Sequence, residues 1–252
     1  MGLRGALALS ALASGVACAG AAPTSPASPA DAAPSSEPAN ASAKTDDSLS
    51  RGGASLFVVH LMSDFDAFKK YFEEGTAART QAGIQGHLLT RLDDGRVVVH
   101  LFADDAAKVE RELASPELEK YLDRKGAPES SLVWVTQNEL IKAPNALPTG
   151  QTFSLFLKLR VTDFAALAQG FEQDLPLFAE HSVIAEGLHR STRKDDIAIL
   201  HFVGTSRDKL DALPKRPEFA QLLARAGNKD EVKPLVGVDV LRSRPVLTPS
   251  SQ

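Results

Sequence analysis

This 252-residue chain has one cysteine, few aromatic residues and no surplus of positive charge. The single cysteine, Cys18, excludes an intrachain disulfide framework and any cysteine-based zinc site. Lys plus Arg number 28 against 32 Asp plus Glu, so the formal net charge is -4 and no overall basic field attracts a nucleic acid. A hydrophobic share of 43% is nevertheless that of a globular protein with a sizeable core.

Signatures of several enzyme and metal-binding classes are also absent from the sequence. It contains no G-x-G-x-x-G, no P-loop, no G-x-S-x-G and no H-E-x-x-H. Dinucleotide, nucleotide and serine-hydrolase chemistry therefore have no support, and no metal site is predicted.

The first 18 residues predict an export signal. Arg4 precedes a run of apolar and small residues over 5–17, which is too short for a permanent membrane span. Residues 14–18, Ser-Gly-Val-Ala-Cys, resemble a bacterial lipobox. This resemblance implies cleavage before Cys18, a lipid on its sulfur and a protein anchored in the membrane of the bacterial cell envelope. The alternative is cleavage after Ala19 by ordinary signal peptidase, which would leave a soluble secreted or periplasmic protein.

The remaining sequence divides into a tether and two related segments. Residues 19–53 are rich in Ala, Pro, Ser and Thr and predict a disordered tether. Repeat 1 covers 54–142 and repeat 2 covers 152–244, with a turn-rich linker at 143–151 and a disordered tail at 245–252.

Self-similarity at a spacing of roughly 100 residues is the strongest internal signal. The matched pairs include Ser55-Leu56-Phe57 with Ser154-Leu155-Phe156, Asp64-Phe65 with Asp163-Phe164, and Val98-Val99-His100 with Ile199-Leu200-His201. In repeat 1 the patterns predict strands at 55–62, 86–92, 96–102 and 132–136, and helices after Asp64 and over 105–125. In repeat 2 they predict a hairpin within 186–203 and a last strand at 235–241. Each repeat is thus a β-α-β-β-α-β unit, which is the ferredoxin-like arrangement of the α+β class.

Several motifs carry a resemblance to a known group. His60-x-Met62-x-Asp64-Phe65-x-x-Phe68, Asp93-Asp94-Gly95 and Ser115-Pro116-Glu117-Leu118 resemble the dimeric α+β barrel superfamily related to antibiotic-biosynthesis monooxygenases. The resemblance implies two ferredoxin-like units that face each other and close a barrel, here as a pseudo-dimer within one chain. The superfamily includes quinone-forming monooxygenases and haem-degrading enzymes.

Two cations alternate with apolar residues in the first strand of repeat 2. Leu155, Leu157 and Leu159 share one face, which should pack on the helices, while Lys158 and Arg160 share the other. The two cations should therefore point into the barrel or its mouth and could bind an amphiphilic carboxylate or phenolate. The alternative is that both are simply solvated at an open barrel end.

Three histidines and a tryptophan complete the candidate ligand-binding residues. His100 and His201 occupy equivalent strand positions, so a pseudo-twofold axis could bring them together as a general base or as metal or haem ligands. Burial as core histidines is the alternative. His60 matches the strand-end histidine of the resembled group, and repeat 2 has Leu159 in its place. Trp134 could offer a stacking surface or pack in the core.

The sequence-based prediction is an exported envelope protein with a non-catalytic binding role, for a small amphiphilic ligand or an envelope partner protein. The alternative is a cofactor-independent monooxygenase or haem-handling enzyme, and a fully packed structural barrel is a third option. No catalytic residue is predicted. The sequence requires no cofactor, and haem is the one cofactor that the resemblance brings into consideration.

Overall fold

The computed structural model describes residues 48–61, 64–114, 116, 132–144, 148–228, 230 and 232–243, and all structural statements concern these residues. The predicted export signal with Cys18, most of the tether, the predicted helix beyond residue 116 and the tail lie outside them. Of the helices in the described part, none is long and apolar enough to cross a membrane.

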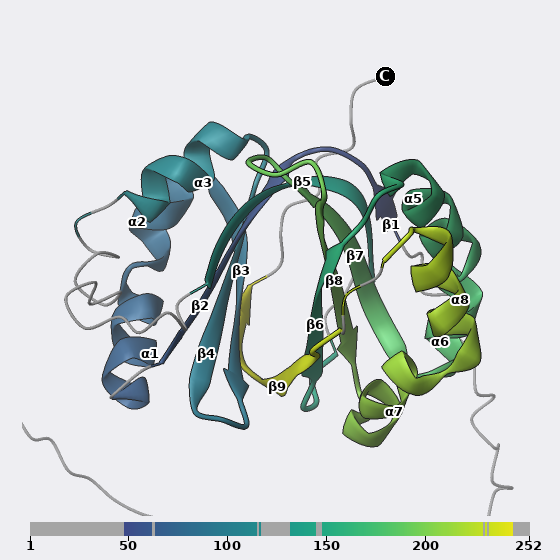
Figure 1. Cartoon of the computed structure of the whole chain (residues 1–252). Coiled ribbons are helices and arrows are strands. Elements are labelled where there is room, and N and C mark those ends of the chain that lie inside the picture. The colour runs from purple at the N-terminus through teal and green to yellow at the C-terminus, as the bar shows by residue number, and fades with distance from the viewer. Residues whose placement is uncertain are drawn as a thin grey trace, which may run out of the picture. The chain divides into compact units, whose positions relative to one another are not determined.

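The described chain forms two halves whose elements follow closely similar orders (Figure 1). The first half contains β2 (Ala54–Leu61), α1 (Phe65–Glu74), α2 (Thr76–Gln81), β3 (Ile84–Leu92), β4 (Arg96–Ala103), α3 (Ala106–Leu113) and β5 (Leu132–Ala143). The second contains β6 (Phe153–Arg160), α5 (Phe164–Gln173), α6 (Leu175–Glu180), β7 (Val183–Ser191), β8 (Ile197–Gly204), α7 (Arg207–Ala212), the 3-10 turn η1 (Leu213–Lys215), α8 (Pro217–Arg225) and β9 (Leu235–Ser243). This order confirms the predicted α+β class and the pair of ferredoxin-like units.

The first helix of each half begins in the same way. The Asp64 carboxylate accepts a hydrogen bond from the backbone N–H of Ala67 at 2.9 Å, and that of Asp163 accepts one from Ala166 at 2.8 Å. Both aspartates have extended backbone angles, as an N-cap requires. The two aspartates are therefore explained by helix capping.

Eight antiparallel strands close into a barrel. Their order is β5-β2-β4-β3-β9-β6-β8-β7, and β7 pairs back to β5. The last strand of each half makes the junctions, because β5 pairs with β2 and β7 while β9 pairs with β3 and β6. Figure 1 shows α1, α2 and α3 against the strands of the first half and α5, α6, α7 and α8 against those of the second.

Two segments differ from the sequence-based expectations, and barrel closure accounts for both. The strand predicted at 132–136 extends to Ala143, because its second part pairs with β7 of the other half. Within the predicted tether, Ser48–Ser50 form β1, which pairs with the end of β5. Backbone hydrogen bonding to an available strand orders this segment despite its few apolar side chains.

The strands alternate between two environments. Leu155, Leu157 and Leu159 are buried in a cluster with helix residues, as predicted, and Leu56 and Val58 do the same in the first half. The opposite faces point into the barrel. There, an inner cluster joins the two halves and consists of Phe57, Val59, Leu92, Val98, Phe156, Ile197 and Ile199.

Candidate functional site

A pair of aromatic rings divides the barrel interior into two regions. The ring centroids of Phe57 and Phe156 lie 6.2 Å apart in an edge-to-face arrangement. Along the inward face of β6, Ser154, Phe156 and Lys158 follow at two-residue steps, which places Ser154 and Lys158 on opposite sides of Phe156. One region lies on the Lys158 side and the other on the Ser154 side.

The region on the Lys158 side is a cavity of about 360 Å³, called here the cationic cavity. It is lined by Arg96, Leu132, Trp134, Phe156, Lys158, Leu159, Arg160, Ile197, Ile199, Asp230, Lys233 and Leu235. Its floor is thus aromatic and aliphatic, and its rim carries more cations than carboxylates. This combination suits an amphiphilic anion.

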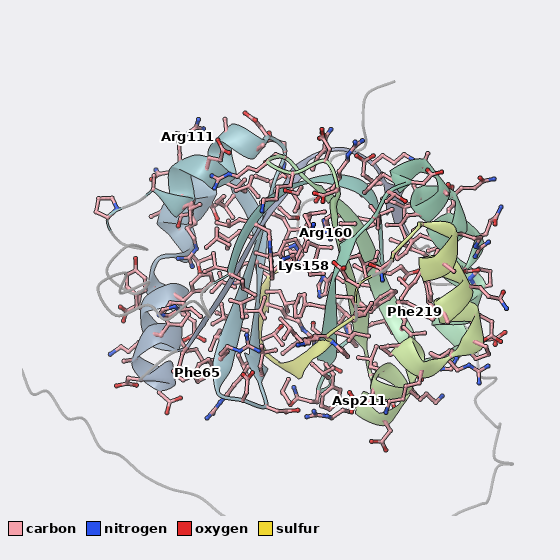
Figure 2. The ribbon with its side chains drawn as sticks, viewed as in Figure 1. Phe65, Arg111, Lys158, Arg160, Asp211 and Phe219 are labelled. Atoms are coloured by element: carbon pink, nitrogen blue, oxygen red, sulfur yellow. The ribbon has the colours of Figure 1, made fainter. Side chains whose placement is uncertain are left out.

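The cations of the rim differ in whether they form ion pairs. Arg160 Nε lies 3.6 Å from carboxylate oxygens of both Asp196 and Asp230. Arg96 pairs with Asp94 at 2.6 Å. Lys158 is exposed, and within the described residues it has no carboxylate at ion-pair distance. Figure 2 labels Lys158 and Arg160 on β6, at the barrel between the two sets of helices. Lys233 is also exposed, and among the described residues it too has no carboxylate at ion-pair distance. Lys158 and Lys233 are therefore the rim cations best able to meet a ligand anion.

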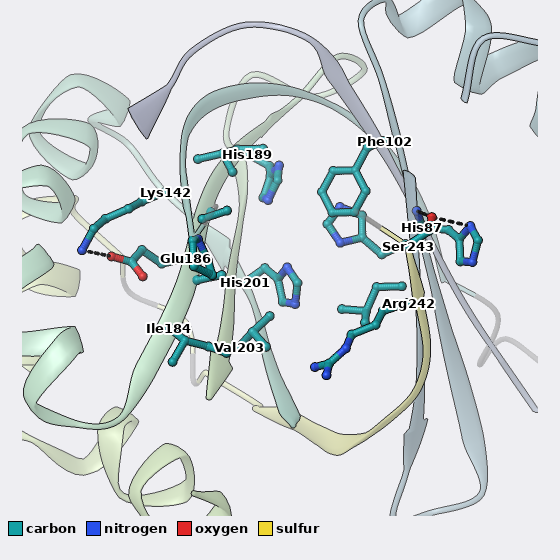
Figure 3. A pocket seen from close by; sticks show the side chains of 17 residues that line it. His87, Phe102, Lys142, Ile184, Glu186, His189, His201, Val203, Arg242 and Ser243 are labelled. Carbon is teal, nitrogen blue, oxygen red and sulfur yellow. Dashed lines mark hydrogen bonds and ion pairs between the residues drawn. The ribbon is translucent and has the colours of Figure 1, made fainter. Parts of the chain in front are cut away.

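The region on the Ser154 side is a smaller pocket of about 80 Å³, called here the histidine pocket (Figure 3). Its lining includes His100 from β4, His189 from β7 and His201 from β8. Their exposed fractions are 0%, 1% and 5%. One nitrogen of each imidazole lies within 4.8 Å of a nitrogen of the other two.

Aromatic stacking holds two of these imidazoles against the dividing rings. His100 stacks on Phe57 with a centroid distance of 3.9 Å, and His201 stacks on Phe156 at 4.4 Å and 5°. The third imidazole is fixed by a hydrogen bond of 2.8 Å between His189 Nδ1 and Asn138 Oδ1.

Burial keeps the three imidazoles neutral. It lowers the pKa of His201 to about 3, and it lowers the pKa values of His100 and His189 well below the ordinary range. The neighbouring imidazoles lower the pKa values of His100 and His189 further. Each ring therefore presents one N–H donor and one lone pair at neutral pH.

The candidate residues predicted from the sequence fall into three places. His100 and His201 come together, with ring centroids 4.9 Å apart, while Lys158, Arg160 and Trp134 line the separate cationic cavity. His60 lines neither region, because it shares the helix-facing side of β2 with Leu56 and Val58.

His189 was missed by the sequence reasoning. Its counterpart in the first half is Thr90, so a search for matched histidines passes over it. Alternation of side chains within β7 could have placed His189 on the inward face. The structure agrees, because His189 lies across from inward-facing Ile199.

The histidine pocket does not fit haem. Pockets that enclose ligands of drug size have volumes of roughly 300–1,000 Å³, whereas about 80 Å³ is open beside the three imidazoles. The larger cavity has no histidine among its described lining residues. No step of the chemistry is therefore derived through haem.

Solved structures similar to this chain share its fold. A Fusobacterium nucleatum protein named as a candidate monooxygenase has a TM-score of 0.56 and 10% identity, with 76% of this chain and 94% of that one covered. An anthrone oxidase-like protein has a TM-score of 0.51 and 14% identity, with 78% and 96% covered. A Listeria monocytogenes ferredoxin-fold protein related to antibiotic-biosynthesis monooxygenases has a TM-score of 0.47 and 9% identity, with 76% and 96% covered. No protein-family model and no curated protein sequence matched the chain.

These comparisons support the class of fold and correct one prediction. The neighbours with TM-scores above 0.5 share the fold of this chain and are named as monooxygenases or as oxidase-like, in agreement with the fold that the resemblance in the sequence implies. The prediction of a non-catalytic binding role is wrong, because the neighbours with TM-scores above 0.5 are named for oxidative enzymes. The predicted location in the cell envelope stays a prediction. The sequence-based reasoning had treated the motifs as scaffold alone and therefore placed the enzymatic reading second.

Proposed function

We propose that this protein is a cofactor-independent monooxygenase that oxidises an anionic aromatic compound in the cationic cavity. The observation that carries the proposal is the cavity itself, about 360 Å³ in volume, with an aromatic floor and a cationic rim. The names of the oxidase-like and monooxygenase-like structural neighbours support the same reaction class.

The cavity can stabilise the reactive form of such a substrate. An aromatic hydroxyl or an acidic ring CH₂ group reacts with O₂ only after losing a proton, so the anion must be favoured. Lys158 and Arg160 stabilise that anion by charge, while Trp134 and Phe156 offer ring faces for stacking. The apolar floor excludes water from the reacting carbon.

The proposed reaction needs no external reductant. A ring CH₂ group flanked by aromatic rings becomes a carbonyl: one atom of O₂ enters the product and the other leaves as water with the two hydrogens of the CH₂ group. The substrate supplies all four electrons. A compound of the anthrone type meets these requirements and serves as the probe.

Oxygen uptake with anthrone tests the proposal. The full chain, carrying Cys18→Ser to remove its only thiol, is assayed beside Lys158→Gln and Arg160→Gln. We expect O₂ uptake with quinone formation, and kcat/KM lower by about tenfold or more in Lys158→Gln, because hydrogen bonds to charged groups contribute roughly 1.5–3 kcal/mol. Lys70→Gln on α1, an exposed cation outside the cavity, is the matched control. Anthrone that binds in the cavity without consuming O₂ would contradict the proposal.

Export and lipidation at Cys18 remain a proposal from the sequence. Metabolic labelling with a fatty acid in a bacterial host tests it, since Cys18→Ser must abolish the label. Labelling that persists in Cys18→Ser, or a mature N-terminus after Ala19, would favour the soluble alternative.

A further inference from the structure

The histidine pocket joins side chains from both halves of the barrel. His100 comes from β4 of the first half, and His189 and His201 come from β7 and β8 of the second. The ligating nitrogens lie within 4.8 Å of one another, and all three residues are at least nine-tenths buried. Three buried imidazoles without a paired carboxylate are unusual as core packing, because each ring brings a polar nitrogen that needs a partner.

Hydrogen bonding fixes which nitrogen of His189 carries the proton. Asn138 Oδ1 accepts hydrogen bonds from Ser55 Oγ at 2.9 Å and from His189 Nδ1 at 2.8 Å. Because this oxygen can only accept, His189 Nδ1 carries the proton and Nε2 carries the lone pair. His189 Nε2 is buried and has no hydrogen-bond partner within the part of the chain that the structure describes.

The other two rings also leave nitrogens for a ligand. Neither nitrogen of His100 has a hydrogen-bond partner among the described residues, although both are buried. His201 Nε2 lies 3.2 Å from Ser154 Oγ, which leaves Nδ1 of this ring available to a ligand. Unpaired buried nitrogens are costly, and several of them in one pocket indicate an absent partner.

A glycine makes room for the His189 ring at this point. Gly187 lies across from His201 in the β7–β8 pairing, and a Cβ on Gly187 would lie 2.5 Å from His189 Nε2. The first half has Leu88 opposite His100, so this space occurs beside His189 and not at the equivalent position. The pocket volume of about 80 Å³ accommodates an ion and an attached water molecule.

We propose that His100, His189 and His201 bind one divalent transition-metal ion, with zinc as the best fit. Imidazole nitrogens are favoured ligands of zinc, and three histidines with a fourth position open to a pocket form a known type of zinc site. Zn–N bonds of about 2.0–2.1 Å require the rings to approach one another by rotation about their side-chain bonds. Asn138 and Ser154 act as positioning residues that orient two of the ligands.

This site is separate from the cationic cavity, because Phe57 and Phe156 lie between them. The proposal therefore does not depend on the monooxygenase activity. A bound ion would satisfy the unpaired nitrogens and would link strands of the two halves. It would also make the thermal stability of the protein depend on metal concentration.

Metal binding by the apo protein tests the proposal directly. The full chain with Cys18→Ser is stripped with a chelator and titrated with Zn²⁺ and with Co²⁺, whose absorption spectrum reports coordination geometry. We expect one equivalent per chain, a tetrahedral Co²⁺ spectrum and a Tm that rises with Zn²⁺. Stoichiometric binding should be lost in His100→Ala, His189→Ala and His201→Ala, and affinity should fall about 10–100-fold in Asn138→Ala.

Two controls separate ligation from misfolding. His181→Ala removes a histidine that lies outside the pocket and should bind like the parent. Pulsed electron paramagnetic resonance on the Cu²⁺-loaded parent protein counts coordinated imidazoles without any mutation, and we expect more than one. Absence of stoichiometric binding in the parent, a single coordinated imidazole, or binding that survives all three alanine variants would overturn the proposal.

Discussion

The two halves of the barrel share their order of elements but not their inward-facing side chains. At positions where the second half has Lys158 and His189, the first has Val59 and Thr90. Across from His201 lies Gly187, whereas across from His100 lies Leu88. The helix-facing residues diverge far less in character, since both halves place aliphatic and phenylalanine side chains there. Two similar scaffolds thus enclose one cationic cavity and one histidine pocket, instead of two copies of each.

Removing the Phe156 ring, which separates the two regions, should have the largest effect on stability. Phe156 is 3% exposed and contacts both Phe57 and His201. We expect Phe156→Ala to lower the free energy of unfolding by about 3–5 kcal/mol, because it leaves a cavity in a packed interior. Denaturant unfolding measures this loss.

The same variant sharpens the distinction between the two regions. Without the Phe156 ring, an aromatic ligand in the cationic cavity should reach His201. Changes in the NMR chemical shifts of the His201 imidazole on adding the ligand would show this contact. Phe156→Leu, which retains much of the volume, is the matched control. An unchanged unfolding free energy in Phe156→Ala would mean that the ring does not support the inner cluster.

Adding a side chain at Gly187, where the first half has Leu88, should have an intermediate effect on stability. A Cβ at this position would lie 2.5 Å from His189 Nε2, so we expect Gly187→Ala to cost about 1–3 kcal/mol through overpacking. Thermal unfolding of the apo protein measures it. Gly150→Ala is the control, because no atom of the described residues lies within 4 Å of the added Cβ. Equal Tm values for the two variants would show that the space beside His189 is not required.

The smallest effect on stability is expected from a substitution of Asp239. This residue lies opposite Thr90 in the β3–β9 pairing, as Asn138 lies opposite His189 in the β5–β7 pairing. Thr90 Oγ1 donates a hydrogen bond to its carboxylate at 2.8 Å. Burial raises the pKa of Asp239, while hydrogen bonds from Ser154, Thr152 and Thr90 and the charge of Arg242 oppose the rise.

The sign of the pH dependence follows from this raised pKa. The folded state holds the Asp239 proton more tightly than the unfolded state does, so stability falls as the pH rises above the ordinary aspartate pKa toward the raised value. Asp239→Asn should remove this fall and modestly raise the Tm at neutral pH. Parallel Tm-against-pH curves for the two proteins would refute the assignment.

The sequence was a good guide to elements and a partial guide to the site. Alternation placed Leu155, Leu157 and Leu159 against the helices and Lys158 on the inner face, as the structure has them. Matching positions also brought His100 and His201 together. The length of β5 could not be predicted, because it depends on pairing with β7 from the other half.

Other parts of the site required contacts between residues far apart in the sequence. His189 joins the two paired histidines only because β7 and β8 lie side by side in the closed barrel. Trp134 has Gly237 at the matching position, and the structure supplies the reason: a Cβ at Gly237 would lie 2.4 Å from the backbone oxygen of Arg91. No local pattern contains that approach.

By itself, the sequence determined the α+β class, the repeated order of strands and helices, the helix caps and the side of each strand that faces the helices. These features depend on residue spacing and on hydrogen bonds within a few residues. The tertiary structure decided which strands close the barrel, which histidines meet, and that Phe57 and Phe156 divide the interior into two regions. Those outcomes depend on packing and register between distant strands, where a difference of one methylene or one residue changes what can fit.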